Sequence, residues 1–341
     1  MRQNGAKQIG IARQIFVLQG TLRTVLQRYA QSSVPTQRPS PRHPELTIGK
    51  QNPFFHFSWS SVPDSWREEM KRRVNHMEAT CQKTNRSLDG STANKGPLSH
   101  VMYVDDRHRL ILCAMPKVGC TSSKRLLYAL TGNIDKENYF KFGDNRGGLV
   151  TSYRKYLPRL EHFSSFGVQF RLKRYLKVIL VRHPLERLVS AYRDKVEGVT
   201  NDVVYPQTAK KIAKMFEVNP SPGMLAGKEG VSFPAFVKYI SSLDPKKDYD
   251  GHFENYNRLC SPCEVHYDVI IRWETLSRDV KMMLELLGVA DIFEFPTSEG
   301  RQHSTEIWKK YFTSVNRTDI RKLWRHYDLD ARLFNYTLNW L

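Results

Sequence analysis

The residues best suited to chemistry lie in a short polar segment, residues 116–122, that follows an apolar run. Lys117 brings a fixed positive charge, Gly119 lets the backbone approach a ligand closely, and Thr121 and Ser122 offer hydroxyls. The free N–H groups of the helix that follows would face the same space, so the segment predicts an anion site. Its spacing is not that of a nucleoside triphosphate P-loop, and an ordinary turn between a strand and a helix is the alternative explanation.

A second segment of the same kind follows the apolar run 176–181. Pro184 suits the first turn of a helix, and the apolar positions after it fall on one face. That arrangement leaves Arg182, Arg187 and Ser190 for solvent or for a ligand. Two such units suit a ligand that carries phosphates at two places.

The elements that must position these residues alternate between strands and helices. Continuous apolar runs predict strands at 110–113, 176–181 and 267–271, and helical spacing predicts helices at 65–77, 231–243 and 275–287. Such repeats indicate an α/β fold with a parallel sheet covered by helices on both faces. The ligand crevice should lie at the carboxyl ends of the strands, where both phosphate turns fall. Asp105 and Asp106 precede the first of these strands, where a hairpin turn explains them better than metal binding does.

Several segments, taken together and in order, resemble one family. Residues 116–125 look like the 5′-phosphosulfate-binding segment of the Golgi carbohydrate sulfotransferases, and residues 182–195 look like their 3′-phosphate-binding segment. Later blocks also resemble that family, at residues 251–253, 259–263, 267–270 and 273–276. The branch that the chain most resembles is the chondroitin and dermatan 4-O-sulfotransferases. Ser123 and His183 depart from the family pattern, since a Trp and an acidic residue are expected there.

The resemblance implies a sulfotransferase fold, which is a P-loop-like parallel sheet flanked by helices. It also implies 3′-phosphoadenosine 5′-phosphosulfate as co-substrate, with no metal. Lys117 would act on the 5′-phosphosulfate, Arg182 and Ser190 would bind the 3′-phosphate, and Arg187 is a further candidate for that group. The implied donor-binding residues are Pro116, Lys117, Val118, Gly119, Cys120, Thr121, Ser122, Arg182, His183, Pro184, Arg187 and Ser190.

A sugar hydroxyl needs a base, and histidine is apt because its ordinary pKa lies near neutrality. His252 lies in one of the blocks that resemble the family, so it is the first candidate, and His162 is the second. A structural or surface histidine is the alternative for either residue.

The charge balance favours polyanionic partners. The chain has 53 Lys and Arg against 34 Asp and Glu, a formal net charge of +19. Nucleic acid is disfavoured because the sequence has neither a zinc-finger spacing nor an aromatic RNA-binding signature. An acidic glycan of the chondroitin or dermatan kind fits better, although a basic surface without a polymer partner would look the same. Residues 153–166 could line its groove, and residues 199–228 could close over it as a lid.

The five cysteines leave at least one thiol unpaired or bridged to another chain. Cys260 and Cys263 form a Cys-x-x-Cys pair without a second pair at metal spacing, so we expect a structural role. Cys113 falls inside a predicted strand, where we expect a small buried hydrophobic side chain.

The chain divides into three predicted parts, namely residues 1–53 as an N-terminal segment and stem-like linker, 54–100 as a helical lead-in, and 101–341 as the catalytic domain. The family implies a Golgi membrane protein with a signal anchor and a lumenal catalytic domain. The first 30 residues contain no apolar run of the roughly 20 residues that a spanning helix needs. Sequons at Asn85, Asn316 and Asn335 would carry glycans in the secretory pathway.

The preferred interpretation is sulfuryl transfer to the 4-hydroxyl of N-acetylgalactosamine in chondroitin or dermatan. Glucuronic acid or the terminal N-acetylgalactosamine of an N-glycan are alternative acceptors. A P-loop kinase or nucleotidase would need a Walker Lys-Ser/Thr pair and an Asp for Mg²⁺, which the sequence lacks at the expected spacing. An inactive basic glycan-binding module remains the non-enzyme alternative, and the oligomeric state stays open.

Overall fold

The computed structural model describes residues 57–84, 100–132, 157–198, 205–244, 250–296 and 304–338. Residues 55–341 belong to one compact unit. The expected N-terminal anchor and stem, the sequon at Asn85, and parts of the expected groove (153–156) and lid (199–204) lie outside the described residues. None of the described helices is both long enough and apolar enough to span a membrane.

A four-stranded sheet forms the centre of the fold, in the order β1 (Met102–Asp105), β2 (Leu110–Cys113), β3 (Leu176–Val181) and β4 (Val269–Arg272). β2, β3 and β4 are parallel, which confirms the predicted α/β class, but β1 pairs with β2 in the antiparallel sense. The sheet is therefore mixed and not entirely parallel as expected. The reason is the short connection from β1 to β2, because a turn of this length can only join antiparallel strands. Asp105 and Asp106 lie at that turn, as expected.

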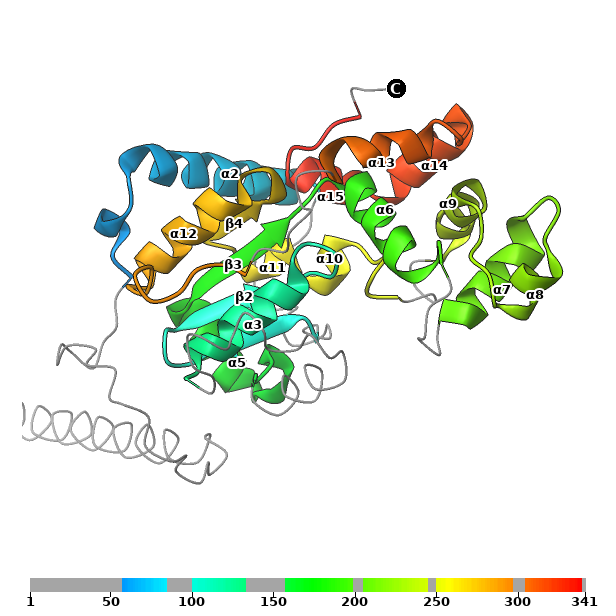
Figure 1. The fold of residues 1–341 in the computed structure, drawn as a ribbon. Helices are drawn as coiled ribbons and strands as arrows, with labels where there is room; N and C mark the ends of the chain where they lie inside the picture. Colours follow the sequence, from blue (N-terminus) through cyan, green and yellow to red (C-terminus); the bar gives the residue numbers. More distant parts are fainter. Residues whose placement is uncertain are drawn as a thin grey trace, which may run out of the picture. The chain divides into compact units, whose positions relative to one another are not determined.

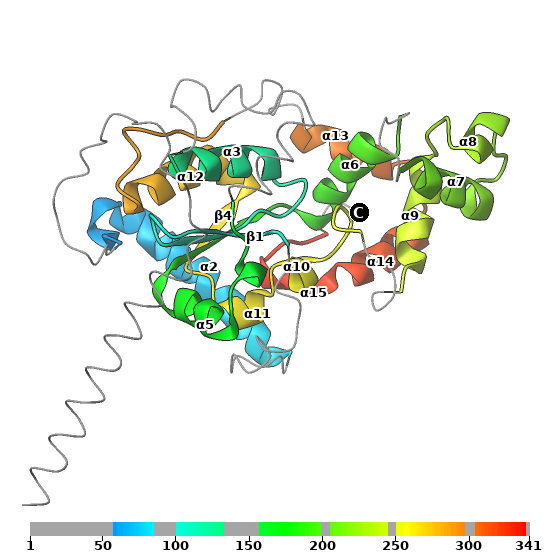
Figure 2. The ribbon, with the colours of Figure 1, turned by 90° about the horizontal axis from the view of Figure 1, so that it is seen from below.

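Helices cover both faces of the sheet, as its fully buried central strands require. Figure 2 shows α3 (Cys120–Leu130) and α12 (Leu276–Leu286) on one side, and α2 (Asp64–Lys83) and α5 (Ser165–Arg174) on the other. The helices predicted near 65–77, 231–243 and 275–287 are confirmed as α2, α9 (Phe233–Ser242) and α12. Met70 and Met77 of α2 are fully buried in the same core as the strands.

A second buried cluster lies beyond the end of β3, around α6 (Pro184–Lys195) in Figure 1. Most of its other members come from α7 (Tyr205–Phe216), α9, α13 (Ser304–Phe312) and α14 (Arg317–His326). Within the expected lid, α7 and α8 (Pro222–Ala226) pack against each other, and α7 packs on α9. The aromatic tail forms terminal helices as predicted, ending with α15 (Asp328–Leu333). The turn that follows β3 thus connects the two clusters.

Two disulfides join segments far apart in the sequence. Cys81 of α2 pairs with Cys263 of α11 (Pro262–Val265), and Cys113 of β2 pairs with Cys260 after α10 (Tyr256–Leu259). The expectation that Cys113 is only a small buried hydrophobic residue was wrong, because its strand brings it beside Cys260. The structural role predicted for Cys260 and Cys263 is confirmed, and Cys120 keeps a free thiol.

Candidate active site

The turn between β2 and α3 adopts a strained backbone. Lys117 and Gly119 both have left-handed φ angles, of 69° and 73°. A Cβ atom on Gly119 would lie 3.4 Å from the ring of Phe295 and 3.7 Å from that of Trp273. The left-handed conformation costs energy for a side chain such as Lys117, so the surrounding structure must hold it in place. The turn ends at Cys120, where the first N–H groups of α3 begin.

Lys117 forms an ion pair with a residue that the sequence did not single out. Its Nζ lies 2.9 Å from Oδ2 of Asp194 on α6, and Nζ of Lys195 lies 3.6 Å from the same oxygen. Burial lowers the pKa of Lys117, and the Asp194 carboxylate opposes that shift. The two segments that resembled a donor site therefore meet through side chains.

The second turn, after β3, contains a buried ion pair. Nη2 of Arg182 lies 2.7 Å from Oε1 of Glu186, and both side chains are at most 5% exposed. Nη1 of Arg182 donates to the carbonyl oxygen of Lys117 at 3.2 Å, and the guanidinium lies 4.5 Å from the ring centroid of Trp273. Nε of Arg182 has no acceptor among the described residues. The two turns are thus hydrogen-bonded to each other at the carboxyl ends of β2 and β3.

The hydroxyl residues of the two segments differ in exposure. Thr121 is exposed and Ser122 is buried within the first turn of α3, while Ser190 lies partly exposed on α6. In the first turn, Val118 is buried and Pro116 is partly buried, so these two residues shape the backbone that carries Lys117.

Arg187 does not face solvent, contrary to the prediction from the helical face. It is fully buried and donates to the carbonyl oxygens of His252, at 3.4 Å, and of Glu254. Its guanidinium also packs near the rings of Tyr256 and Tyr327. The amphipathic pattern failed here because a second layer of helices and the segment 252–254 cover this face of α6. Arg187 holds the backbone of His252 in place.

His183 also turns away from the expected arrangement. Its ring stacks on Trp308 at a centroid distance of 4.8 Å and lies 5.3 Å from Tyr336. Nε2 donates to the carbonyl oxygen of Thr337 at 3.1 Å, and burial lowers the pKa of the imidazole. The ring is therefore enclosed by the C-terminal aromatic residues, while the main chain of His183 and Pro184 begins α6 at the turn.

His252 lies partly exposed in a polar network. Its Nδ1 is 2.6 Å from the hydroxyl oxygen of Tyr205 and 3.1 Å from Oδ1 of Asp250. The Asp250 carboxylate can only accept, so its contact with Nδ1 is a hydrogen bond when the proton of the neutral ring is on Nδ1. That tautomer leaves Nε2 without a proton, which is the state that a base requires.

His162 lies in a different environment. It belongs to the short helix η3 (Leu160–His162), is 44% exposed, and has Nε2 at 2.9 Å from Arg159 and 4.0 Å from Glu161. These partners are its neighbours in sequence, whereas the network of His252 joins residues from separate elements.

A chain of contacts joins Lys117 to His252. It runs from Lys117 to Asp194 and Lys195, whose Nζ lies 5.1 Å from the ring centroid of Tyr205, and from Tyr205 to His252. Sequence reasoning missed Asp194, Tyr205 and Asp250. Asp250 could have been found as a carboxylate two residues before a candidate base. No pattern in the neighbouring sequence singles out Tyr205.

Among the described residues, no group of three or more His, Cys, Asp or Glu side chains could hold a metal ion. Burial is the main cause that lowers the pKa of His100; the charge of Glu161 raises that pKa, and those of Arg159 and Lys124 lower it further.

Comparisons with known proteins agree with this architecture. The profile of the sulfotransferase family matches residues 100–337. Carbohydrate sulfotransferase 9 of Homo sapiens is 31% identical over 311 residues, which cover 85% of this chain and 68% of that protein. Carbohydrate sulfotransferase 8 of Mus musculus is 32% identical over 284 residues, 82% of this chain and 65% of that protein. Carbohydrate sulfotransferase 11 of Mus musculus is 32% identical over 246 residues, which cover 71% of this chain and 68% of that protein. The chain thus spans about two thirds of the length of these relatives, and no solved structure matches it significantly.

Proposed function

Because the chain belongs to the sulfotransferase family, we propose that it transfers a sulfuryl group from 3′-phosphoadenosine 5′-phosphosulfate to a hydroxyl of an acidic glycan. The observation that carries the proposal is the meeting of two cationic turns at one edge of the sheet, where Arg182 donates to the carbonyl of Lys117. A donor with a phosphosulfate at one end and a 3′-phosphate at the other needs two such turns.

The first turn suits the 5′-phosphosulfate. The donor supplies an activated sulfuryl group whose leaving phosphate oxygen gains negative charge during transfer. Lys117 provides a cation for that charge, and the N–H groups of Val118 to Ser122 with the hydroxyls of Thr121 and Ser122 bind the same phosphate. The second turn suits the 3′-phosphate through Arg182 and Ser190. We assign Arg187 to holding the segment 252–254 and not to phosphate contact, because it donates to the carbonyl oxygens of His252 and Glu254 and lies near the rings of Tyr256 and Tyr327.

His252 is the proposed base. Asp250 and Tyr205 hold its Nδ1 proton, so Nε2 can accept the proton of the acceptor hydroxyl as the new sulfur–oxygen bond forms and the bond to the phosphate breaks. Asp250 and Tyr205 position the ring without touching the substrate. The chain of contacts through Asp194 and Lys195 fixes the base relative to Lys117.

An acidic acceptor fits the charge around the site. Lys124 and Arg159 lie in the electrostatic surroundings of His100, and Lys117 and Lys195 lie in those of Asp194, so the carboxylates of a glycan would meet cations here. Within that class we propose chondroitin or dermatan, with the 4-hydroxyl of N-acetylgalactosamine as the acceptor. Relatives named carbohydrate sulfotransferase 8, 9, 10 and 11 match at 31% to 33% identity, so specificity must be tested directly.

The Golgi lumen is the proposed compartment. Two disulfides favour an oxidising environment, since cytosolic thiols are kept reduced. If the sequons receive glycans, glycosidase treatment of the expressed chain should increase its gel mobility, and unchanged mobility would argue that the sequons never meet the lumen.

The decisive experiment incubates the purified chain, without added metal, with radiolabelled donor and with desulfated chondroitin, dermatan and heparan. We expect label in the chondroitin or dermatan chains. His252→Ala should lose transfer while keeping affinity for 3′-phosphoadenosine 5′-phosphate, and His162→Ala should keep both. No incorporation into any glycan by a protein that binds the nucleotide would refute the proposed activity and favour a binding module.

A further inference from the structure

A pocket of about 880 Å³ lies away from the phosphate turns, and we propose that it binds a segment of an acidic oligosaccharide. It opens at the amino ends of the parallel strands, since its lining includes Lys177 of β3 and Asp268, which directly precedes β4. The phosphate turns follow the carboxyl ends of those strands. The pocket is therefore separate from the site where transfer is proposed, and none of its lining residues has a role there.

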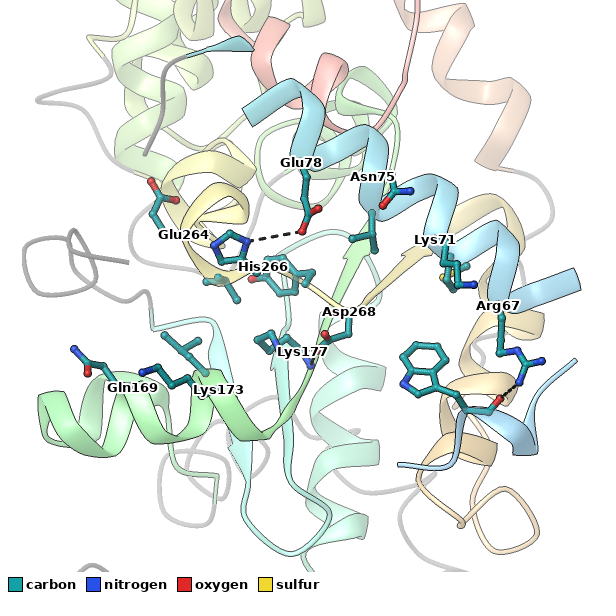
Figure 3. Close-up of a pocket in the computed structure, with 16 residues that line it drawn as sticks. Arg67, Lys71, Asn75, Glu78, Gln169, Lys173, Lys177, Glu264, His266 and Asp268 are labelled. Carbon is teal, nitrogen blue, oxygen red and sulfur yellow. Dashed lines mark hydrogen bonds and ion pairs between the residues drawn. The ribbon is translucent and has the colours of Figure 1, made fainter. Parts of the chain in front are cut away.

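The pocket is built from three segments that face one another. Figure 3 shows Lys173 of α5 and Arg67 of α2 at opposite ends, with Lys177 and Asp268 between them. The lining is elongated in this view, which suits a chain of sugar rings better than a compact ligand. The volume lies within the range of about 300 to 1,000 Å³ that is usual for ligand sites.

The lining combines apolar and hydrogen-bonding groups. Met70, Val74 and Leu172 are among its apolar members, and Trp59, which is 36% exposed, also lines it. The amides of Asn75 and Gln169 can both donate and accept hydrogen bonds. Sugar rings present an apolar face and a rim of hydroxyls, so this mixture fits a saccharide.

Charge decides the class of saccharide. The lining has four Lys and Arg side chains against three carboxylates: Asp268 lies 2.7 Å from Lys177, Glu78 lies 3.8 Å from Nδ1 of His266, and Glu264 is partly buried. Lys173, by contrast, is an exposed cation at the end of α5.

At the other end, Lys71 is 67% exposed and forms a surface ion pair with Glu68, a kind of pair that holds its partners weakly. Cations thus stand near both ends of an elongated pocket, where they would meet the carboxylates of a glycan.

The backbone of one wall is strained. His266 and Ser261 have left-handed φ angles of 56° and 42°, and they flank the short helix α11. The disulfide from Cys263 in α11 to Cys81 holds this segment against α2, the helix that carries Glu78. Strain of this kind persists where the surroundings over-determine it, often at ligand sites. Here it presents the His266 imidazole to the pocket.

The proposal does not require sulfuryl transfer, although its ligand class matches the proposed acceptor. A polymer held at this pocket would keep other parts of the same polymer at high local concentration around the protein. A failure of this pocket to bind a glycan can therefore be told apart from a failure of the proposed sulfuryl transfer.

The test uses an unsulfated chondroitin hexasaccharide and the full chain without donor. Hydrogen exchange should slow in residues 169–173 and 264–268, and it should do so equally in His252→Ala, which keeps the pocket intact. A Trp59→Ala/Lys173→Glu variant should lose that protection, and calorimetry should show at least tenfold weaker binding there. Lys322→Glu, which reverses an exposed charge on α14, is the matched control and should bind as the wild type does.

Three outcomes would overturn the proposal. Unchanged affinity and protection in folded Trp59→Ala/Lys173→Glu would remove the pocket as the site. Protection confined to the surroundings of Lys117 and His252 would assign all glycan binding to the transfer site. Equal affinity for a neutral chitin hexasaccharide would remove the acidic requirement. Loss of transfer with binding here intact would count against the proposed activity alone.

Discussion

The turns after β2 and β3, where we propose that the two phosphates of the donor bind, occupy equivalent places in the fold but hold their cations in opposite ways. Lys117, after β2, has a side chain that is 18% exposed and a partner, Asp194, that is 40% exposed. Arg182, after β3, is 5% exposed and its partner Glu186 only 3%. The first cation is held by a partner at the surface, and the second is fixed inside the protein.

This difference separates two tasks. A buried, paired guanidinium keeps one orientation and suits binding, because reorganisation would leave a charge without a partner. An ammonium with an exposed partner can exchange that partner for a substrate group at little cost, which suits a role that changes during the reaction. We therefore expect the first turn to control turnover and the second to control affinity.

The largest effect should come from Lys117→Ala. Loss of the cation opposite the leaving phosphate should reduce kcat about 1,000-fold, since one such electrostatic contact contributes 10²–10³. Affinity for 3′-phosphoadenosine 5′-phosphate, measured by calorimetry, should change much less. Lys117→Arg is the charge-conserving control. Near-normal turnover by folded Lys117→Ala would contradict the proposed division of tasks between the two turns.

Arg182→Ala should weaken the same nucleotide about 100-fold, because a charged hydrogen-bonded contact is worth about 3 kcal/mol. Its kcat at saturating donor should fall less than that of Lys117→Ala. The substitution also leaves Glu186 buried without its cation, so unfolding in urea must be measured alongside. Glu186→Gln keeps the shape and tests the pair, and equal nucleotide affinity in wild type and Arg182→Ala would remove Arg182 from the site.

Asp194→Asn should have a smaller effect that depends on pH. Burial lowers the pKa of Lys117 and the Asp194 carboxylate raises it, so removal of the carboxylate must lower that pKa further. The alkaline limb of the pH–rate profile should move to lower pH. At a pH on that limb the rate should fall about tenfold relative to wild type, and at neutral pH it should change little. Asp194→Glu should restore the wild-type limb, whereas identical profiles for all three proteins would show that the pair does not influence turnover.

The smallest expected effect concerns the backbone of the first turn. Gly119→Ala should reduce the free energy of unfolding by about 1 kcal/mol, because a left-handed φ disfavours a Cβ atom. Gly288→Ala is the matched control, with a φ of +65° and nothing within 4 Å of its added Cβ, compared with Phe295 at 3.4 Å for Gly119. Both variants should lose similar stability in urea titrations, and only Gly119→Ala should lose activity.

Local patterns in the sequence predicted the parts of the fold that depend on neighbouring residues. The strand and helix around each turn were found because apolar runs and helical spacing are local signals. The burial of Arg187 and the pairing of Cys113 were not found, because each depends on segments more than 60 residues away.

In the candidate site, too, residues with a local sequence signal could be proposed, and residues that depend on distant partners could not. Lys117, Arg182 and His252 could be proposed from residue type and motif, and their roles remain predictions. Asp194 and Tyr205 could not, since a carboxylate 77 residues from Lys117 and a phenol 47 residues from His252 become partners only in the folded chain.

The disulfide between Cys113 and Cys260 has a consequence for the chain before it is oxidised. Cys113 ends the strand that leads to Lys117, and Cys260 follows the segment that carries His252, so the bond links the segments of the proposed cation and the proposed base covalently. The two cysteines are 147 residues apart in the sequence. In a reduced chain they must therefore meet by diffusion of a long loop, whose closure costs conformational entropy. We therefore expect a reduced chain to hold the geometry of the proposed site less firmly than the oxidised chain does.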